Sequence, residues 1–241
     1  MAYNLIFKFK EGTMIFQSSY RWLTSQSIWN APNEVEKTQK KLEGKNLSFV
    51  EKMKMGAKTG LSSIPRSVVI SLIATVIISQ IYPPLNFQEM KECIDKNKSL
   101  LSQEGDLIFT NIQLKSLPRP LKTAIKAIWE EIIFRGGIQN LLGKLENSES
   151  KILSSLGSLK GRVTISSLAF AAIHLNNFNA PCQGALTGLT QLAVNILLSD
   201  MTILYETGGL TATMTGHVVR NLTPWAVSSI IQTIFASSSI G

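Results

Sequence analysis

The sequence predicts an all-α fold, a polytopic bundle of membrane helices that follows a basic, charged N-terminal extension. The charge distribution is the first reason. Residues 163–241 hold only three charged side chains, whereas residues 1–162 hold the other 37 of 40, with 23 Lys and Arg against 14 Asp and Glu. The second reason is that the poorly charged part consists of apolar runs of helical length separated by Gly, Asn and Pro. Together these features are typical of one membrane domain with an extension.

We assign residues 1–65 to the extension and residues 66–241 to the membrane-embedded domain. Pro32, in the segment 30–33, predicts a turn and a helix start, and residues 34–58 are then predicted to form one charged helix. Its lysines alternate with glutamates, and the chain has no zinc-finger or RNA-binding signature, so we expect no nucleic-acid partner. Positive charge beside a membrane span instead predicts a cytoplasmic N-terminus.

The first uncharged apolar run, residues 67–82, lies between Arg66 and a Pro-Pro pair. As a helix it would rise about 24 Å, which is less than the roughly 30 Å of a hydrocarbon core. We therefore expect a short span with Arg66 at the membrane interface. A charged segment over residues 86–120 should lead into the next helix.

Five more helices are predicted, which makes six candidate spans in all. A polar loop over residues 143–162 should follow the first of them, which Gly136 and Gly137 would loosen. Several are shorter than an ideal span, which membranes tolerate where helix ends line a protein cavity. The predicted helices cover residues 121–142, 163–175, 184–205, 209–221 and 224–240.

The two cysteines, Cys93 and Cys182, are far apart in the sequence, and neither belongs to a CxxC pair. This spacing supports neither a disulfide framework nor a cysteine zinc site, so we expect two ordinary thiols.

Histidine occurs only twice in the chain, as His174 and His217, and both lie in stretches with hardly any other charge. A polar group in such a setting is costly unless it is paired or has a function. Because positions four apart share a helix face, His174 should lie beside Phe170, and His217 should lie beside Asn221. Both histidines are therefore candidate functional residues.

Two adjacent glutamates, Glu130 and Glu131, precede Arg135. Glu131 is four residues from Arg135, whereas Glu130 is turned by about 100° around the helix, so the two carboxylates cannot use the arginine equally well. We expect a structural Glu131–Arg135 ion pair. Glu130 should then face a cavity, where it could act as a general base.

These residues stand in the order EExxxR, FxxxH and HxxxN, and this order resembles the CPBP family (CAAX proteases and bacteriocin-processing enzymes), also called the Abi family. Residues 129–136 are similar to the family's EExxFRG sequence, and residues 205–210 are similar to its Y-x-x-T-G-x-L approach to the last histidine. The resemblance covers roughly residues 120–225. The family commonly has about eight spans, so the low hydrophobicity of the front half is a departure from it.

The resemblance implies an intramembrane endopeptidase that acts on peptides or lipid-modified protein tails. Glu130 with His174 would activate a water, and Asn221 with His217 would stabilise the oxyanion. Glu131 and Arg135 would hold the helix and orient Glu130. The implied catalytic residues are Glu130, His174, His217 and Asn221.

A metal-dependent version stays open at this point. One carboxylate and two histidines, here Glu130, His174 and His217, also form the ligand set of several hydrolytic zinc sites. The chain has no HExxH, which excludes a zincin-type site. The alternative is catalysis without metal, with Glu130 as the base.

Two other functions compete with a protease. The first is a catalytically idle membrane scaffold or immunity protein that binds a partner through the same cavity, and the complete set of candidate catalytic residues argues against it. The second is a transporter that relays protons through its buried acids and histidines, which the absence of inverted repeats disfavours. For the protease we expect a peptide or protein substrate, contact with membrane lipid, and a multi-pass location in a bacterial inner membrane.

Overall fold

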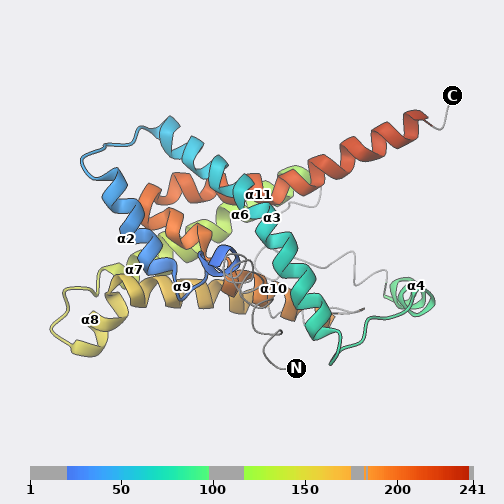
Figure 1. Ribbon diagram of the computed structural model, residues 1–241, viewed down its shortest axis with the longest axis horizontal. Coiled ribbons are helices and arrows are strands. Elements are labelled where there is room, and N and C mark those ends of the chain that lie inside the picture. Colours follow the sequence, from blue (N-terminus) through green and yellow to red (C-terminus); the bar gives the residue numbers. More distant parts are fainter. Residues whose placement is uncertain (1–20, 98–116, 175–181, 183, 239–241) are drawn as a thin grey trace, which may run out of the picture.

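The computed structural model describes residues 21–97, 117–174, 182 and 184–238, and this part of the chain confirms the all-α prediction (Figure 1). No strand occurs among these residues. In chain order the helices are α2 (Ala31–Leu42), α3 (Phe49–Ile78), α4 (Phe87–Lys96), α6 (Arg119–Glu131), η2 (Ile132–Gln139), α7 (Asn140–Gly143), α8 (Lys151–Gly157), α9 (Leu159–Ile173), α10 (Gly184–Leu197) and α11 (Asp200–Ser238).

The single charged helix predicted over residues 34–58 is wrong, because the structure has two helices there. Helix α2 carries Pro32 in its first turn, as predicted, and ends at Leu42. Gly44 then adopts a φ of +73°, which favours glycine and ends the helical path. Helix α3 starts anew with a capping box between Ser48 and Glu51.

Helix α3 runs without interruption through Pro65 and so crosses the predicted domain boundary at residues 65 and 66. The division into an extension and a membrane domain stays a prediction, and residues 1–20 lie outside the described part. Of the predicted span 67–82, residues 67–78 form the last part of α3, which ends at Ile78. Large side chains exposed there are apolar, as lipid contact requires: Val68, Leu72, Ile73, Val76 and Ile77.

The six predicted spans are only partly reproduced. Among the described residues, α3 is the one helix long and apolar enough to cross a membrane, and α10 with the first part of α11 passes as a second span bent by 55°. Helix α9 has 15 residues, and α6 carries lysines and glutamates, so neither qualifies by length and composition.

The helix predicted over residues 121–142 is continuous but not uniform. It is built from α6, η2 and α7, and its middle part, which contains Gly136 and Gly137, is a π-helix. The helix is therefore loosened at these glycines, as predicted, because a π turn is wider than an α turn. The predicted loop 143–162 is wrong in its second half, because it contains α8 and the start of α9, which Ser158 caps.

Helix α11 folds back on itself at Gly209, and the predicted break after residue 205 therefore lies inside it. The chain leaves α10 at Leu197 and enters α11 at Asp200. Gly209 has a φ of +74° and a ψ of −172°, a conformation open essentially to glycine alone. We call residues 200–208 the first leg and residues 210–221 the second leg of the α11 hairpin.

Close approach between α3 and the second leg depends on glycines. A Cβ on Gly56 would meet the carbonyl oxygen of Ala212, and one on Gly60 would meet that of Gly216. Small residues four apart allow two helix backbones to approach closely, as they do in membrane proteins. Figure 1 shows α3 passing across α11 at this contact.

The prediction of two ordinary thiols is wrong, because Cys93 of α4 and Cys182 form a disulfide with their Cα atoms 5.8 Å apart. The bridge closes a loop of 89 residues, and spacing in the sequence gives no sign of such a contact. The expected break at residues 176–181 and much of the charged segment 86–120 fall outside the described residues.

Candidate active site

The predicted ion pair between Glu131 and Arg135 is present at the junction of α6 and η2. Arg135 Nε lies 3.4 Å from Glu131 Oε2, and both side chains are almost completely buried. Arg135 also donates from Nη2 to the Thr202 hydroxyl at 3.4 Å, which joins η2 to the first leg of the α11 hairpin. The pair therefore holds α6 against the helices that carry the histidines.

Glu131 has a second partner that the sequence did not reveal. His217 Nδ1 lies 2.8 Å from Glu131 Oε1, across 86 residues of sequence. A carboxylate accepts and does not donate, so the proton of this hydrogen bond is on Nδ1. Glu131 thus fixes both the ring orientation and the tautomer of His217.

Glu130 lies on the other side of the same imidazole. Its Oε2 is 3.5 Å from His217 Nε2, and the residue is 7% exposed. His217 therefore stands between two carboxylates, one hydrogen-bonded and one at contact distance. Two adjacent glutamates are a weak signal by themselves. Here they place one carboxylate near each nitrogen of the His217 ring.

His174 follows the last residue of α9 and faces the same region. Its Nδ1 lies 2.9 Å from the carbonyl oxygen of Phe170. A carbonyl can only accept, so Nδ1 carries the proton and Nε2 is left as an acceptor. The charges of Glu130 and His217 both act on this ring.

Phe170 explains why the FxxxH pattern needs an aromatic residue. Its ring centroid lies 5.0 Å from that of His174 and 5.7 Å from that of His217, both in edge contacts. Arg135 stacks on it with Cζ 4.3 Å from the centroid. Phe170 thus contacts both histidines and covers the guanidinium with an apolar surface.

Asn221 lies one helical turn beyond His217 on the second leg and is half-buried. Its side chain makes no hydrogen bond with any other described residue. The structure therefore brings the EExxxR and FxxxH residues and His217 into one region, and Asn221 follows His217 on the second leg.

The comparison with known proteins agrees with this arrangement. Residues 117–223 match the model of the family described as type II CAAX prenyl endopeptidase Rce1-like. The match covers a little under half of the chain, and we call residues 117–223, which are similar to this family, the Rce1-like segment. It contains α6 to the second leg of α11 and with them every motif residue from Glu130 to Asn221. No curated protein and no solved structure matches the chain.

A metal ligand set is not assembled in the described part of the Rce1-like segment. No group of three or more His, Cys, Asp or Glu side chains is placed there to hold a metal ion. Glu130 and His217 are neighbours, but His174 does not complete a set with them. We therefore derive no step through a metal.

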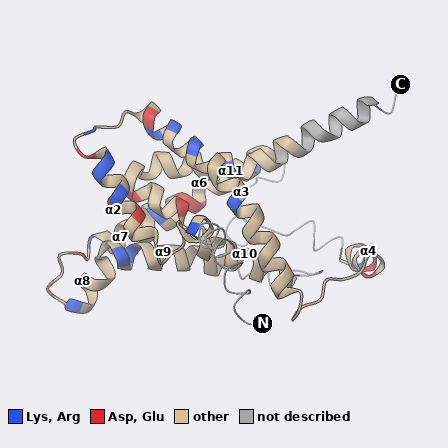
Figure 2. Ribbon diagram, viewed as in Figure 1, with Lys and Arg blue, Asp and Glu red and all other residues tan. Residues whose placement is uncertain are grey.

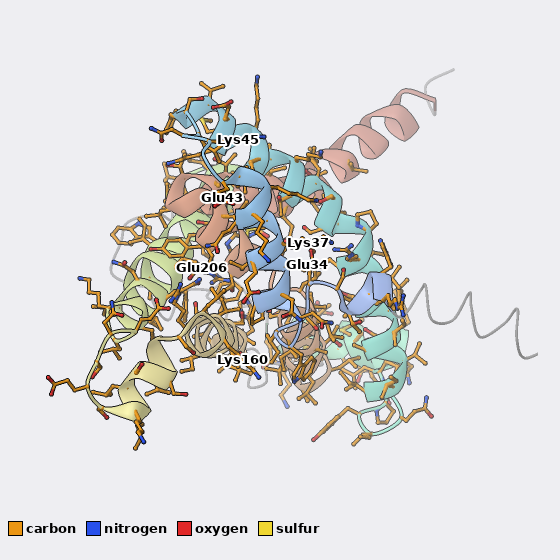
Figure 3. All side chains as sticks on the ribbon, turned by 60° about the vertical axis from the view of Figure 1, so that its left-hand side comes forward. Glu34, Lys37, Glu43, Lys45, Lys160 and Glu206 are labelled. Carbon is orange, nitrogen blue, oxygen red and sulfur yellow. A yellow bond between two sulfur atoms is a disulfide. The ribbon has the colours of Figure 1, made fainter. Side chains whose placement is uncertain are left out.

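A pocket of about 260 Å³ lies at the end of the α11 hairpin near Gly209, and its lining includes none of the predicted catalytic residues. Arg162 hydrogen-bonds both oxygens of Glu206 there, at 2.9 and 3.0 Å, and this bonding raises the pKa of Arg162. Glu206 is also linked to α2, because its carbonyl oxygen accepts from Gln39 Nε2 at 3.1 Å. Figure 3 labels Glu206 together with Glu34 and Lys37 of α2, which form an ion pair.

Sequence reasoning missed Asp200 and Arg220 as well as Glu206. These are the only three charged residues after residue 162, and that isolation was the available signal. Asp200 lies outside the motifs, and Glu206 and Arg220 occupy unspecified positions within them, so their partners could not be named. The structure pairs Arg220 Nη1 with Asp200 Oδ1 at 3.0 Å.

Proposed function

We propose that the chain is a multi-pass intramembrane endopeptidase that hydrolyses peptide bonds in peptide or lipid-modified protein substrates by means of an activated water. The observation that carries this proposal is the convergence of Glu130, Glu131, His174 and His217 on one buried region within the Rce1-like segment. The similarity of that segment to the family supports a CAAX-protease type of endopeptidase in general. The roles below extend it to individual residues.

Glu130 is the proposed base. Three carboxylates of this region, those of Glu130, Glu131 and Asp200, are balanced by only two guanidinium groups, those of Arg135 and Arg220. Glu130 is the carboxylate without a guanidinium, so it is the one available to take a proton from water. His174 Nε2, an acceptor because of its bond to Phe170, would orient that water.

His217 and Asn221 are the proposed oxyanion donors. The donor role requires a proton on His217 Nε2 as well as on Nδ1, and the Glu131 carboxylate at Nδ1 would stabilise that charged ring. Attack of the hydroxide on the peptide carbonyl creates a negative oxygen, which Nε2–H and the Asn221 amide would bind. Glu130 then passes its proton to the leaving amine, which balances the reaction.

Membrane insertion follows from α3 and from the charge distribution. Figure 2 shows Lys and Arg gathered over α2, the first turns of α3 and α8, whereas α3 has no charge after Arg66. Positive residues are retained on the cytoplasmic side, so we place the N-terminal end of α3 there. The Cys93–Cys182 disulfide follows the other end of α3, and disulfides persist in oxidising compartments.

The test is peptide cleavage by the purified protein in detergent or liposomes. The probe is a fluorogenic peptide that ends in a farnesylated CAAX sequence, with the unmodified peptide beside it. We expect a new peptide terminus, identified by mass spectrometry, and its absence with Glu130→Gln. Intact probe after prolonged incubation with a panel of modified and unmodified peptides would favour the idle scaffold instead.

A further inference from the structure

Asp200 and Arg220 form an ion pair that the proposed chemistry does not use. Asp200 opens the first leg of the α11 hairpin and is 1% exposed, and its Oδ1 accepts from Arg220 Nη1 at 3.0 Å. Arg220 lies on the second leg, three residues after His217 and directly before Asn221. The pair thus joins the two legs beside the proposed oxyanion donors.

We propose that Asp200 is a positioning residue of this site, which fixes the second leg, and with it His217 and Asn221, through Arg220. The proposal rests on the proposed function for its catalytic readout. It assigns a role to a residue outside the three sequence motifs.

The hairpin has a hinge at one end and this ion pair at the other. Its legs run antiparallel, since a Cβ on Gly208 would meet that of Ala212, and one on Gly216 would lie 3.0 Å from Leu204 Cδ2. At the turn, a Cβ on Gly209 would meet nothing within 4 Å, so side-chain packing does not brace the hinge. The ion pair is therefore a polar link between the ends of the legs, in addition to the apolar contact of Met201 and Leu204 with Ala212.

Small rotations at this hinge matter for catalysis. His217 is eight residues from Gly209, which is about 12 Å along a helix. A rotation of roughly 5° about the hinge would displace the imidazole by about 1 Å, and a displacement of that size can lower a rate by about 10²-fold. Glu131 holds the ring, but Asn221 has no partner among the described residues to hold it.

The N-terminal region holds the Asp200 end in place. Gln26 O accepts from Ser199 N at 2.7 Å, and Ile196 O accepts from Ile28 N at 3.1 Å, so this segment satisfies the backbone at the break between α10 and α11. Ser27 is fully buried. Residues 26–28 of the predicted extension thus bind the segment that leads into the first leg of the hairpin.

Burial makes Asp200 dependent on its arginine. Asp200 Oδ2 is buried without a hydrogen-bond partner among the described residues, as are Gln26 Oε1 and Ser27 Oγ of the N-terminal segment. The Arg220 guanidinium is the group that pairs directly with the carboxylate, and the charges of Arg66 and Arg135 also act on it. Removal of either partner should therefore shift the second leg and not merely expose a surface charge.

The first test compares Asp200→Asn with Glu206→Gln, a matched control on the same leg whose partner, Arg162, belongs to α9. With the CAAX peptide we expect kcat to fall about 10- to 100-fold in Asp200→Asn, with KM within about twofold and a normal folded fraction. Asp200→Asn combined with Arg220→Gln should be no worse than the poorer single variant, because both remove one link. Equal losses of kcat in Asp200→Asn and Glu206→Gln would overturn the proposal.

The second test does not need protease activity. Cys93 and Cys182 are disulfide-bonded, so Asn221→Cys would be the sole free thiol among the described residues. We expect Asp200→Asn to change the maleimide labelling rate of this thiol at least about threefold, and Glu206→Gln to leave it unchanged. A labelling rate unaffected by Asp200→Asn would refute the positioning role. If the wild type cleaves no peptide, the proposed function fails while this labelling still decides the role of Asp200.

Discussion

His217 Nδ1 donates to Glu131 Oε1 at 2.8 Å, while the other oxygen of the same carboxylate lies 3.4 Å from Arg135 Nε. The second glutamate of EExxxR therefore serves the histidine of HxxxN as well as its own arginine. Glu131 is the link between two motifs that are 86 residues apart. This link separates the two glutamates by role, since Glu130 has no guanidinium partner.

Glu131→Gln should mainly lower the yield of folded protein. The substitution leaves the buried Arg135 guanidinium without its counter-charge, and breaking a buried pair costs about 3–5 kcal/mol. Size-exclusion chromatography and thermal unfolding in detergent measure the effect, with Glu130→Gln as the neighbouring control. Wild-type yield and melting temperature in Glu131→Gln would mean that the pair does not hold the fold.

Gly60→Ala should disturb the site from outside it. The new Cβ would meet the backbone carbonyl of Gly216, which precedes His217, and a backbone atom cannot move aside cheaply. We expect loss of folded protein, or folded protein with at least about tenfold lower activity. Gly143→Ala is the control, because its Cβ would only contact the flexible Arg162 side chain at 3.6 Å. Equal activity of the two variants would contradict the close packing of α3 on the second leg.

The disulfide gives a test of orientation. Membrane-impermeant maleimide should label Cys93 and Cys182 only after reduction, and only from the side opposite the N-terminal end of α3. Labelling of intact spheroplasts and of inverted vesicles, each with and without an impermeant reductant, measures this. Labelling without reductant would contradict the disulfide, and labelling confined to inverted vesicles would contradict the orientation.

Activity should survive exhaustive chelation. The described residues do not gather three metal ligands, and the proposed oxyanion donors include an amide, which is a poor zinc ligand. Elemental analysis of the active preparation accompanies the assay. Stoichiometric zinc together with loss of activity on chelation would instead establish the set Glu130, His174 and His217 as ligands.

The sequence predicted the local relationships of the site but not the contacts between its motifs. A spacing of four placed Glu131 beside Arg135 and His174 beside Phe170, because helix geometry alone decides such pairs. The Glu131–His217 bond and the Asp200–Arg220 pair depend on how α6 and the α11 hairpin pack. Periodicity does not encode that packing.

Helix existence was also easier to predict than helix ends. The break at Gly44 and the fold-back at Gly209 each depend on one glycine with positive φ, which the sequence marks only as a glycine among others. Pro65 and Pro224 lie inside helices and end neither of them. The disulfide joins Cys93 and Cys182, which are 89 residues apart, so only the folded structure shows that they meet.

The central claim is that Glu130 is the base of an intramembrane endopeptidase, and kcat of purified Glu130→Gln on a peptide that the wild type cleaves tests it most directly. Removal of a general base lowers a rate by about 10²–10⁴-fold. We predict a loss of kcat in that range, with a wild-type melting temperature and elution profile, because Glu130 is not the partner of Arg135. Turnover at the wild-type rate by folded Glu130→Gln would contradict the account.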